Sequence, residues 1–250
     1  MPEEPKRRAI VLIPGLQRVE RFSRRDLLIE NLQHLERRPM QRGEAVAVLG
    51  EAGRRVLPLP LSSAPYAFVT LLLASFKTDE LAQMAQFSKD YLENRRRDAE
   101  VGLRDRIRRR VAETLERVLA EPYAEIVVVG HSFGSVIAID LLAGWPHPLD
   151  RERLALVTLG SPEAVLACRS RWLDAEREKL FECRLAVWLD FHSPTDWLCT
   201  AVTRHRRHYP EGSRELHFEA PLLDRVTGRT HMAYYGDPAV LESLAAPRLD

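Results

Sequence analysis

The chain has 250 residues, of which 45% are hydrophobic, and its formal net charge is only +1. This length allows one sizeable hydrophobic core, so we expect a single domain over residues 1–250. Basic and acidic residues nearly balance and no long block carries one sign, which argues against a nucleic-acid partner. The three cysteines form no CxxC pair and the N-terminus lacks the pattern of a signal peptide. We therefore expect a reducing, cytoplasmic setting without disulfides or a zinc site.

Predicted strands and helices alternate along the chain. Apolar and β-branched runs predict strands at residues 8–15, 54–60, 125–131, 154–160, 184–191 and 214–220. Helical patterns occupy residues 23–38, 78–119, 133–143, 163–180, 197–207 and 232–245, and Gly102 is a candidate break in the second of them. This alternation predicts an α/β fold with a mostly parallel central sheet of about six strands and helices on both faces.

The longest apolar stretch is APYAFVTLLLASF, at residues 64–76. As a helix it would span about 20 Å, whereas the hydrocarbon core of a bilayer is about 30 Å thick. It fits a buried helix, a lid over an apolar pocket, or a contact with a membrane surface or a second subunit. The segment 62–119 that contains it is longer than one helix requires, so we interpret it as a helical insertion or lid after the second strand.

The residues Gly130-His131-Ser132-Phe133-Gly134 fit the pattern G-x-S-x-G. A predicted strand precedes them and a helical pattern follows, which is the context of a nucleophile elbow. Glycines at its two ends let chain segments approach where a Cβ would collide. The turn also places the backbone N–H of Phe133 at a helix N-terminus, where it would stabilise an oxyanion. The alternative is a plain turn in which Ser132 caps the helix.

These residues resemble the α/β-hydrolase fold, and the likeness extends over residues 8–245. The predicted strands would correspond to the last six of that fold's central sheet. The resemblance implies an oxyanion loop after the first strand, where this chain has VLIPGLQ at residues 11–17. Pro14-Gly15 stands in place of the HG of many members, as it does in some lipase-like ones. We expect the backbone N–H of Leu16 to be the second oxyanion donor, with Gln17 as the alternative.

A nucleophilic serine needs a histidine base, and the base needs a carboxylate that orients it. In the α/β-hydrolase fold these residues follow the serine in the order acid, then histidine. The stretch WLDFHSPTDWLC, residues 188–199, resembles a W-x-N-x-x-D-P-x-D pattern of bacterial lipase-like hydrolases, which makes Asp196 the expected acid. Two positions differ, with Asp190 in place of Asn and Ser193 in place of Asp. Asp196 as a simple helix cap, and Asp190 or Glu163 as the acid, remain alternatives.

The expected base is His231, in TGRTHMAYYGDPAV at residues 227–240. This segment resembles the H-x-x-Y-[WY] segment that precedes the final helix of the same lipase-like group. Other histidines are weaker candidates, since they lie in a predicted strand, in the arginine-rich TRHRRHY or inside the elbow: His217, His205, His208 and His131. No pair of histidines has supported metal-ligand spacing, so we expect neither a metal nor another cofactor.

The resemblance implies a serine hydrolase that cleaves a carboxylic ester through an acyl-enzyme intermediate. Ser132 would attack the acyl carbonyl, His231 would move the proton and Asp196 would hold the imidazole, while the backbone N–H groups of Leu16 and Phe133 stabilise the oxyanion. The apolar start of the segment 62–119 favours a lipid or acyl ester as the small-molecule substrate. An acyl-thioesterase and a noncatalytic binding module on the same fold are the alternatives.

Overall fold

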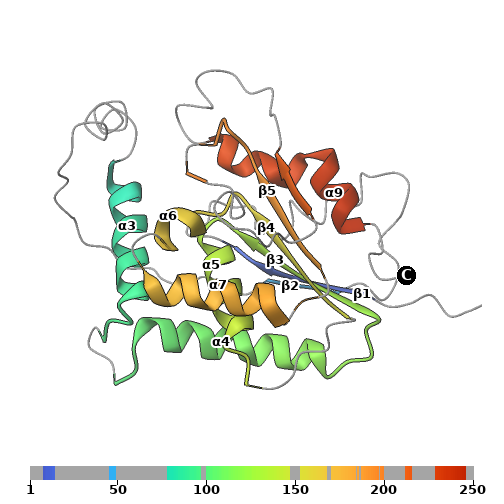
Figure 1. Cartoon of the computed structure of the whole chain (residues 1–250), viewed down its shortest axis with the longest axis horizontal. Coiled ribbons are helices and arrows are strands. Elements are labelled where there is room, and N and C mark those ends of the chain that lie inside the picture. The colour runs from blue at the N-terminus through green and yellow to red at the C-terminus, as the bar shows by residue number, and fades with distance from the viewer. Residues whose placement is uncertain are drawn as a thin grey trace, which may run out of the picture.

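One parallel β-sheet forms the centre of the molecule (Figure 1). The computed structural model describes residues 8–14, 45–48, 78–96, 100–146, 153–167, 170–183, 185, 187–196, 198–199, 212–215 and 229–245. Within them, six strands are ordered β2-β1-β3-β4-β5-β6, and every neighbouring pair is parallel. Their bounds are β1 (Arg8–Ile13), β2 (Ala45–Val48), β3 (Glu125–His131), β4 (Leu154–Leu159), β5 (Val187–His192) and β6 (Gly212–Glu215). The predicted α/β fold with a mostly parallel sheet is confirmed.

Most predicted strands that fall on described residues lie close to where they were expected. β1, β3 and β4 match their predicted ranges nearly residue for residue, and β5 begins at Val187 instead of residue 184. β6 begins at Gly212, ahead of its predicted start, and residues 216–220 lie outside the described part of the chain. The predicted strand 54–60 lies outside it too, whereas β2 forms from AVAV, which the pattern did not predict. Its four residues are too short a run to stand out in a sequence.

The helices are α3 (Thr78–Leu92), α4 (Leu103–Leu119), α5 (Phe133–Ala143), α6 (Glu163–Ala167), α7 (Arg171–Cys183), the 3₁₀ helix η1 (Arg229–Gly236) and α9 (Pro238–Ala245). The break at Gly102 is confirmed, because this residue is the N-cap of α4. The predicted α5 is also confirmed. The segments 23–38 and 64–76 lie outside the described residues, as do His205, His208 and His217.

Two predicted helices are each divided in the structure. The range 163–180 contains α6 and α7, and the range 232–245 contains the end of η1 followed by α9. In the second case Asp237 and Pro238 explain the new start. The Asp237 carboxylate accepts the backbone N–H groups of Ala239 and Val240, at 2.9 and 3.2 Å, and proline suits the first position of a helix.

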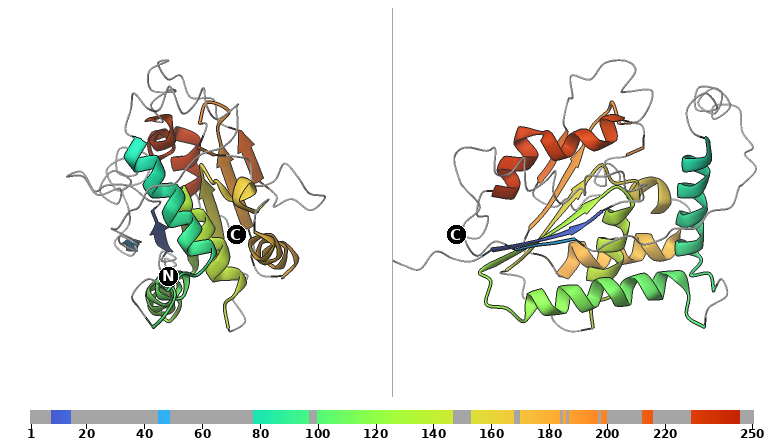
Figure 2. Two further views of the ribbon diagram at one scale, coloured as in Figure 1. Left: turned by 90° about the vertical axis from the view of Figure 1, so that its left-hand side faces the viewer. Right: turned by 180° about the vertical axis from the view of Figure 1, so that it is seen from behind.

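The sheet has a helical layer on each face (Figure 2). Side chains along each strand alternate between two cores, so Val11 and Val128 lie in the core with α3, α4, α5 and α7, while Leu12 and Val129 lie in the core with α9. Strands that are buried on both faces explain the continuous apolar runs in the sequence. None of the helices in the described part of the chain has the length and apolarity to cross a bilayer.

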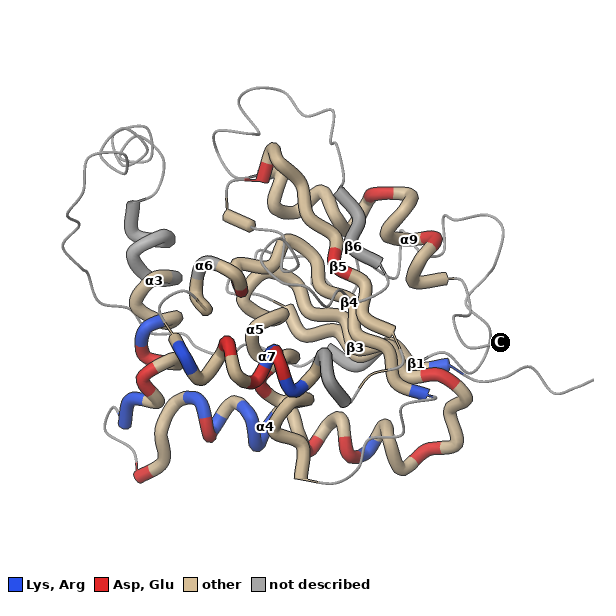
Figure 3. The backbone as a smooth tube through the Cα atoms, in the orientation of Figure 1, with Lys and Arg blue, Asp and Glu red and all other residues tan. Residues whose placement is uncertain are grey.

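Helix α4, in the layer that contains α3, α4, α5 and α7, carries charges of both signs. Basic and acidic residues are interspersed along α4 (Figure 3). The helix buries Ile107, Val111 and Leu115. The helix is therefore amphipathic, with its charged residues on the remaining faces.

The strand order creates one natural place for a site. β1 lies between β2 and β3, so the chain leaves neighbouring strands in opposite directions at this point of the sheet. In open parallel sheets, ligands bind at the carboxyl ends of the strands beside such a reversal. The carboxyl end of β3 is His131, the residue before Ser132.

Candidate active site

Ser132 occupies a strained turn between β3 and α5. Its backbone angles are φ 55° and ψ −132°, and a positive φ is uncommon for a residue other than glycine. Such strain persists only where the surroundings hold it, and it is concentrated at functional sites. The predicted change from strand to helix at this serine is therefore present, with the sharp turn that a nucleophile elbow requires.

The two glycines of the motif are sites of close approach. A Cβ at Gly130 would lie 2.6 Å from the Cα of Ser135, and a Cβ at Gly134 would collide with the carbonyl oxygen of Ile13. Gly134 thus lets the end of β1 lie directly against the first turn of α5. Ile13 and Pro14 consequently lie beside the elbow. Leu16 and Gln17 lie outside the described residues, so the second oxyanion donor stays a prediction.

Asp196 and His231 come together from distant parts of the chain. The Nδ1–H of His231 donates to Oδ2 of Asp196 at 2.7 Å, and both residues are buried. Oδ2 also accepts the hydroxyl of Tyr234 at 3.0 Å, and Oδ1 accepts the backbone N–H of Leu198 at 3.1 Å. Three donors around one carboxyl group fix its orientation toward the His231 ring. The local bond to Leu198 shows that a turn-forming role and contact with the histidine coexist in Asp196.

The second nitrogen of His231 faces a different environment. The Nδ1–H group donates a hydrogen bond to Asp196 and keeps its proton. In the neutral ring, Nε2 is therefore the nitrogen that carries the lone pair. This Nε2 is buried and has no hydrogen-bond partner among the described residues. A positioned imidazole with an accepting Nε2 is what a general base requires.

His131 links the elbow to the base. Its Nε2 donates to the backbone carbonyl of His231 at 2.7 Å, and the two imidazole rings lie 4.7 Å apart between centroids. Ser132 follows His131 directly, so Ser132, Asp196 and His231 all lie at the carboxyl edge of the sheet. His131 thus supports the elbow through a hydrogen bond and ring packing, and it is not placed as the base.

Gly160, at the end of β4, lies against the Asp196–His231 pair. Its φ is +54°, and a Cβ there would lie 2.7 Å from the Tyr234 ring and 3.0 Å from Oδ2 of Asp196. A side chain at this position would push the acid and the base from their places. Gly160 and Tyr234 were not among the predicted site residues. The only sequence signals for them were a glycine directly after a strand and the tyrosine of the H-x-x-Y segment.

The alternative acids have other partners. Oδ1 of Asp190 accepts the hydroxyl of Thr158 at 2.6 Å. Glu163 pairs with Arg177 at 3.0 Å, and burial raises the pKa of Glu163 to about 7 although Arg177 opposes the rise. Among the described residues, the carboxylate that binds the His231 ring is that of Asp196.

A thiol and a phenol complete the surroundings of Asp196. The Sγ of Cys199 lies 3.3 Å from the hydroxyl of Tyr234. Burial, reinforced by Asp196, raises the pKa of the Cys199 thiol to about 12, so Cys199 stays protonated and is a poor nucleophile. The same two causes raise the pKa of Tyr234, which therefore remains a hydrogen-bond donor. Within the described ranges, no group of three His, Cys, Asp or Glu side chains is placed to hold a metal ion.

Comparisons with known proteins point to one superfamily. The family model described as Lipase (class 3) matches residues 69–190, which include α3, α4 and the elbow. A search of curated proteins found no match. A proposed cell-surface hydrolase from Lactobacillus plantarum WCFS1 is 12% identical, with a TM-score of 0.36, over 76% of this chain and 68% of that one. A likeness at that level carries no argument. The match covers residues 69–190 and includes the elbow, so the chain is similar to lipase-like members of the α/β-hydrolase superfamily.

Proposed function

We propose that this protein is a serine hydrolase of carboxylic esters, with Ser132 as nucleophile, His231 as base and Asp196 as the orienting acid. The observation that carries the proposal is the buried bond from His231 Nδ1 to Asp196, which leaves Nε2 as the accepting nitrogen. The strained backbone of Ser132 at the neighbouring strand end supports the same reading. A noncatalytic module would have no need to hold a histidine in this tautomer.

The proposed reaction has two halves. Ser132 Oγ attacks the acyl carbonyl while His231 Nε2 takes its proton, and the tetrahedral oxyanion is stabilised by the backbone N–H groups of Phe133 and Leu16. The imidazolium then protonates the departing alcohol, which leaves an acyl-serine. Water, deprotonated by His231, attacks this ester, and the carboxylic acid departs as Ser132 regains its proton. Asp196 keeps its hydrogen bond to Nδ1 throughout and stabilises the imidazolium.

The substrate that we favour is a lipid or other acyl ester. The match to a lipase family supports an ester with an apolar acyl part. An acyl thioester would suit the same chemistry, because its carbonyl is attacked in the same way. A panel of p-nitrophenyl esters and acyl-CoA thioesters of increasing chain length separates the two. We expect the esters to give the higher kcat/KM, with a preference for longer acyl chains.

Covalent labelling with a fluorophosphonate probe tests the nucleophile directly. We expect the wild-type protein to be labelled and the variants Ser132→Ala and His231→Ala to be silent. Ser161→Ala and His192→Ala are matched controls, because Ser161 and His192 are also buried at this sheet edge and should leave labelling intact. Labelling that survives Ser132→Ala would assign the wrong serine, and a folded wild-type protein that never reacts would contradict the proposal.

A further inference from the structure

The aromatic ring that follows the candidate nucleophile is held by another helix. Phe133 is the first residue of α5, and only 2% of it is exposed. Two rings of α3 meet it edge to face: Phe87 at 5.3 Å between centroids and Tyr91 at 5.2 Å, with interplanar angles of 85° and 86°. Edge-to-face pairs at this distance are favourable and directional. The position of Phe133 therefore depends on where α3 lies.

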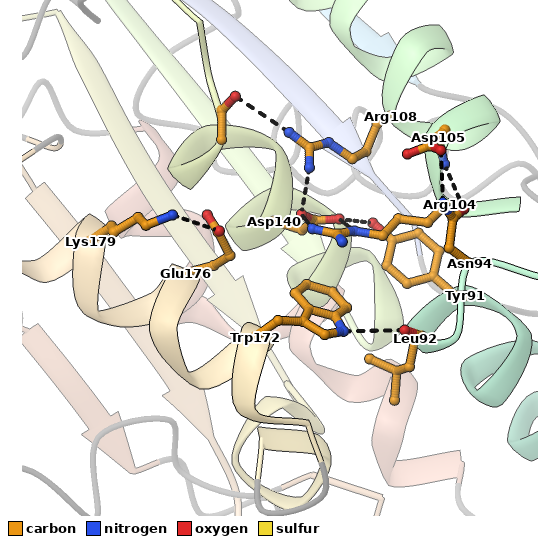
Figure 4. A network of polar contacts seen from close by, with 11 residues as sticks. Tyr91, Leu92, Asn94, Arg104, Asp105, Arg108, Asp140, Trp172, Glu176 and Lys179 are labelled. Carbon is orange, nitrogen blue, oxygen red and sulfur yellow. Dashed lines mark hydrogen bonds and ion pairs between the residues drawn. The ribbon is translucent and has the colours of Figure 1, made fainter. Parts of the chain in front are cut away.

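Tyr91 binds α5 at a second point. Its hydroxyl donates to Oδ2 of Asp140 at 2.6 Å, and Asp140 is fully buried on α5 (Figure 4). Burial, reinforced by the Asp140 carboxylate, raises the pKa of Tyr91 well above its usual value, so the phenol remains a donor. One side chain of α3 thus contacts the beginning of α5 with its ring and a later turn of α5 with its hydroxyl.

Two arginines of α4 compensate the buried charge of Asp140. Arg104 binds both carboxylate oxygens, at 2.8 and 2.5 Å, and Arg108 binds Oδ1 at 3.0 Å. A buried carboxylate costs much free energy unless it is paired and hydrogen-bonded in this way. The cluster therefore joins α3 and α4 to the helix that begins at the elbow.

A tryptophan of α7 completes the attachment of α3. The guanidinium of Arg104 lies 3.7 Å from the ring centroid of Trp172, and the indole N–H of Trp172 donates to the backbone carbonyl of Leu92 at 3.1 Å. Leu92 is the last residue of α3, next to Tyr91. The end of α3 is thereby tied to three other helices. Figure 4 shows Tyr91, Arg104 and Arg108 around Asp140, with the bond from Trp172 to Leu92 beside them.

We propose that α3 is a positioning element for the oxyanion hole, and that Phe87 and Tyr91 act through the ring of Phe133. The backbone N–H of Phe133 is at the N-terminus of α5, where it has no acceptor within the helix. Its direction toward a developing oxyanion depends on the first turn of α5, which the two rings of α3 hold. Small displacements of such a donor matter, because it must lie about 3 Å from the oxyanion. Phe87 and Tyr91 are positioning residues and need not touch the substrate.

This inference rests on the proposed function, and the test measures turnover per active site. Active sites are titrated with the fluorophosphonate probe in wild type, Phe87→Leu and Tyr91→Phe. Ile107→Val is the matched control, because Ile107 lies in the same core at similar burial, 7% exposed against 6% for Phe87, and its aliphatic side chain cannot form an edge-to-face ring pair. For Phe87→Leu we expect kcat per titrated site to fall roughly tenfold, less than the about 10²–10³ lost with a whole oxyanion donor, and KM to change little.

Two further readouts separate positioning from simple destabilisation. A trifluoromethyl ketone forms a hemiketal oxyanion in the same hole, so its affinity should fall by the same factor as kcat. In a double-mutant cycle, Phe87→Leu should cost little more activity once Phe133→Leu has removed the ring on which it acts. Tyr91→Phe retains its ring and should show a smaller loss than Phe87→Leu, while Ile107→Val should keep kcat per site.

The outcomes distinguish the two proposals. A labelled, active wild type in which Phe87→Leu keeps both kcat per site and affinity for the ketone overturns the role of α3 and leaves the proposed function intact. Losses from Phe87→Leu and Phe133→Leu that simply add would also overturn it. A folded wild type that shows neither labelling nor turnover overturns both proposals.

Discussion

Asp196 shares its two oxygens among three donors, and this sharing makes it sensitive to a single-atom change. Asp196→Asn replaces one oxygen with an amide N–H₂, which cannot accept the proton of His231 Nδ1 and favours the other tautomer of the imidazole. We expect kcat to fall by about 10³–10⁴ while the fold is retained, as judged by circular dichroism and thermal unfolding. Asp190→Asn is the control, because Asp190 is buried nearby but binds Thr158. A larger loss in Asp190→Asn would mean that the acid is wrongly assigned.

The hydroxyl of Tyr234 donates a hydrogen bond to the Asp196 carboxylate and helps to hold it in place. Tyr234→Phe removes the 3.0 Å bond and keeps the ring beside Gly160. Without this donor the carboxylate can turn away from the His231 ring. We expect kcat to fall roughly three- to tenfold, since a hydrogen bond contributes about 0.5–1.5 kcal/mol net. Steady-state kinetics measures this loss, and an unchanged kcat in Tyr234→Phe would contradict the role.

At the scale of secondary-structure elements, the contact between β1 and α5 governs the shape of the elbow. Gly134→Ala would place a Cβ against the backbone carbonyl of Ile13, and neither backbone can yield without moving the end of β1. We expect kcat to fall at least about 10²-fold, because the proposed oxyanion donor Phe133 directly precedes Gly134. Steady-state kinetics and the midpoint of thermal unfolding, measured together, separate this loss from simple unfolding.

The matched control is Gly144→Ala, at the other end of the same helix. There the new Cβ would meet the flexible end of the Arg108 side chain, which can move aside. Its φ of −91° is also open to any residue. This variant should keep its activity, and a comparable loss in both variants would mean that α5 responds to any added methyl group.

For the whole molecule, the buried Glu163–Arg177 pair makes stability depend on pH. Burial raises the pKa of Glu163 to about 7, whereas the same group in the unfolded chain ionises near pH 4.5. Between these values the unfolded chain has released a proton that the folded protein still holds, so stability falls as pH rises and levels off above about pH 7. We expect the contribution to amount to roughly 2–3 kcal/mol between pH 5 and pH 8.

Urea unfolding of wild type and Glu163→Gln at pH 5 and pH 8 measures this contribution. The variant should lose less stability than wild type over the same interval, because glutamine does not titrate. Glu113→Gln is the control, since Glu113 is exposed on α4 and should leave the pH dependence unchanged. Equal pH dependence in wild type and Glu163→Gln would show that Glu163 is already ionised in the folded protein at pH 5.

The fold was predictable where local pattern and final environment coincide. β3 is apolar along nearly its whole length because both of its faces are covered, and it stands out in the sequence for the same reason. β2 is four residues long and depends on pairing with β1, so its local signal is weak. The division of 232–245 likewise depended on the capping bonds of Asp237, which compete with the continuing helical pattern.

The candidate site was predictable from order along the chain. Ser132, Asp196 and His231 each follow their own predicted strand, and the carboxyl ends of parallel strands meet at one edge of the sheet. Tyr234 escaped the prediction because its role depends on a bond across 38 residues to Asp196. The pattern of apolar residues along the sequence does not reveal the bond between Tyr234 and Asp196, because that bond forms only when η1 packs beside the loop after β5.

The sequence by itself determined the alternation of strands and helices and the glycine-flanked serine turn, because these follow from local patterns of apolar residues and glycines. The order of the candidate catalytic residues was implied by the resemblance of its motifs to those of α/β-hydrolases. Only the tertiary structure decided which carboxylate binds His231 and how α3 reaches Phe133. The cluster of Tyr91, Arg104, Arg108 and Asp140 joins residues up to 49 positions apart. A buried charge finds its partners by proximity in the folded chain, and separation along the sequence does not encode that proximity.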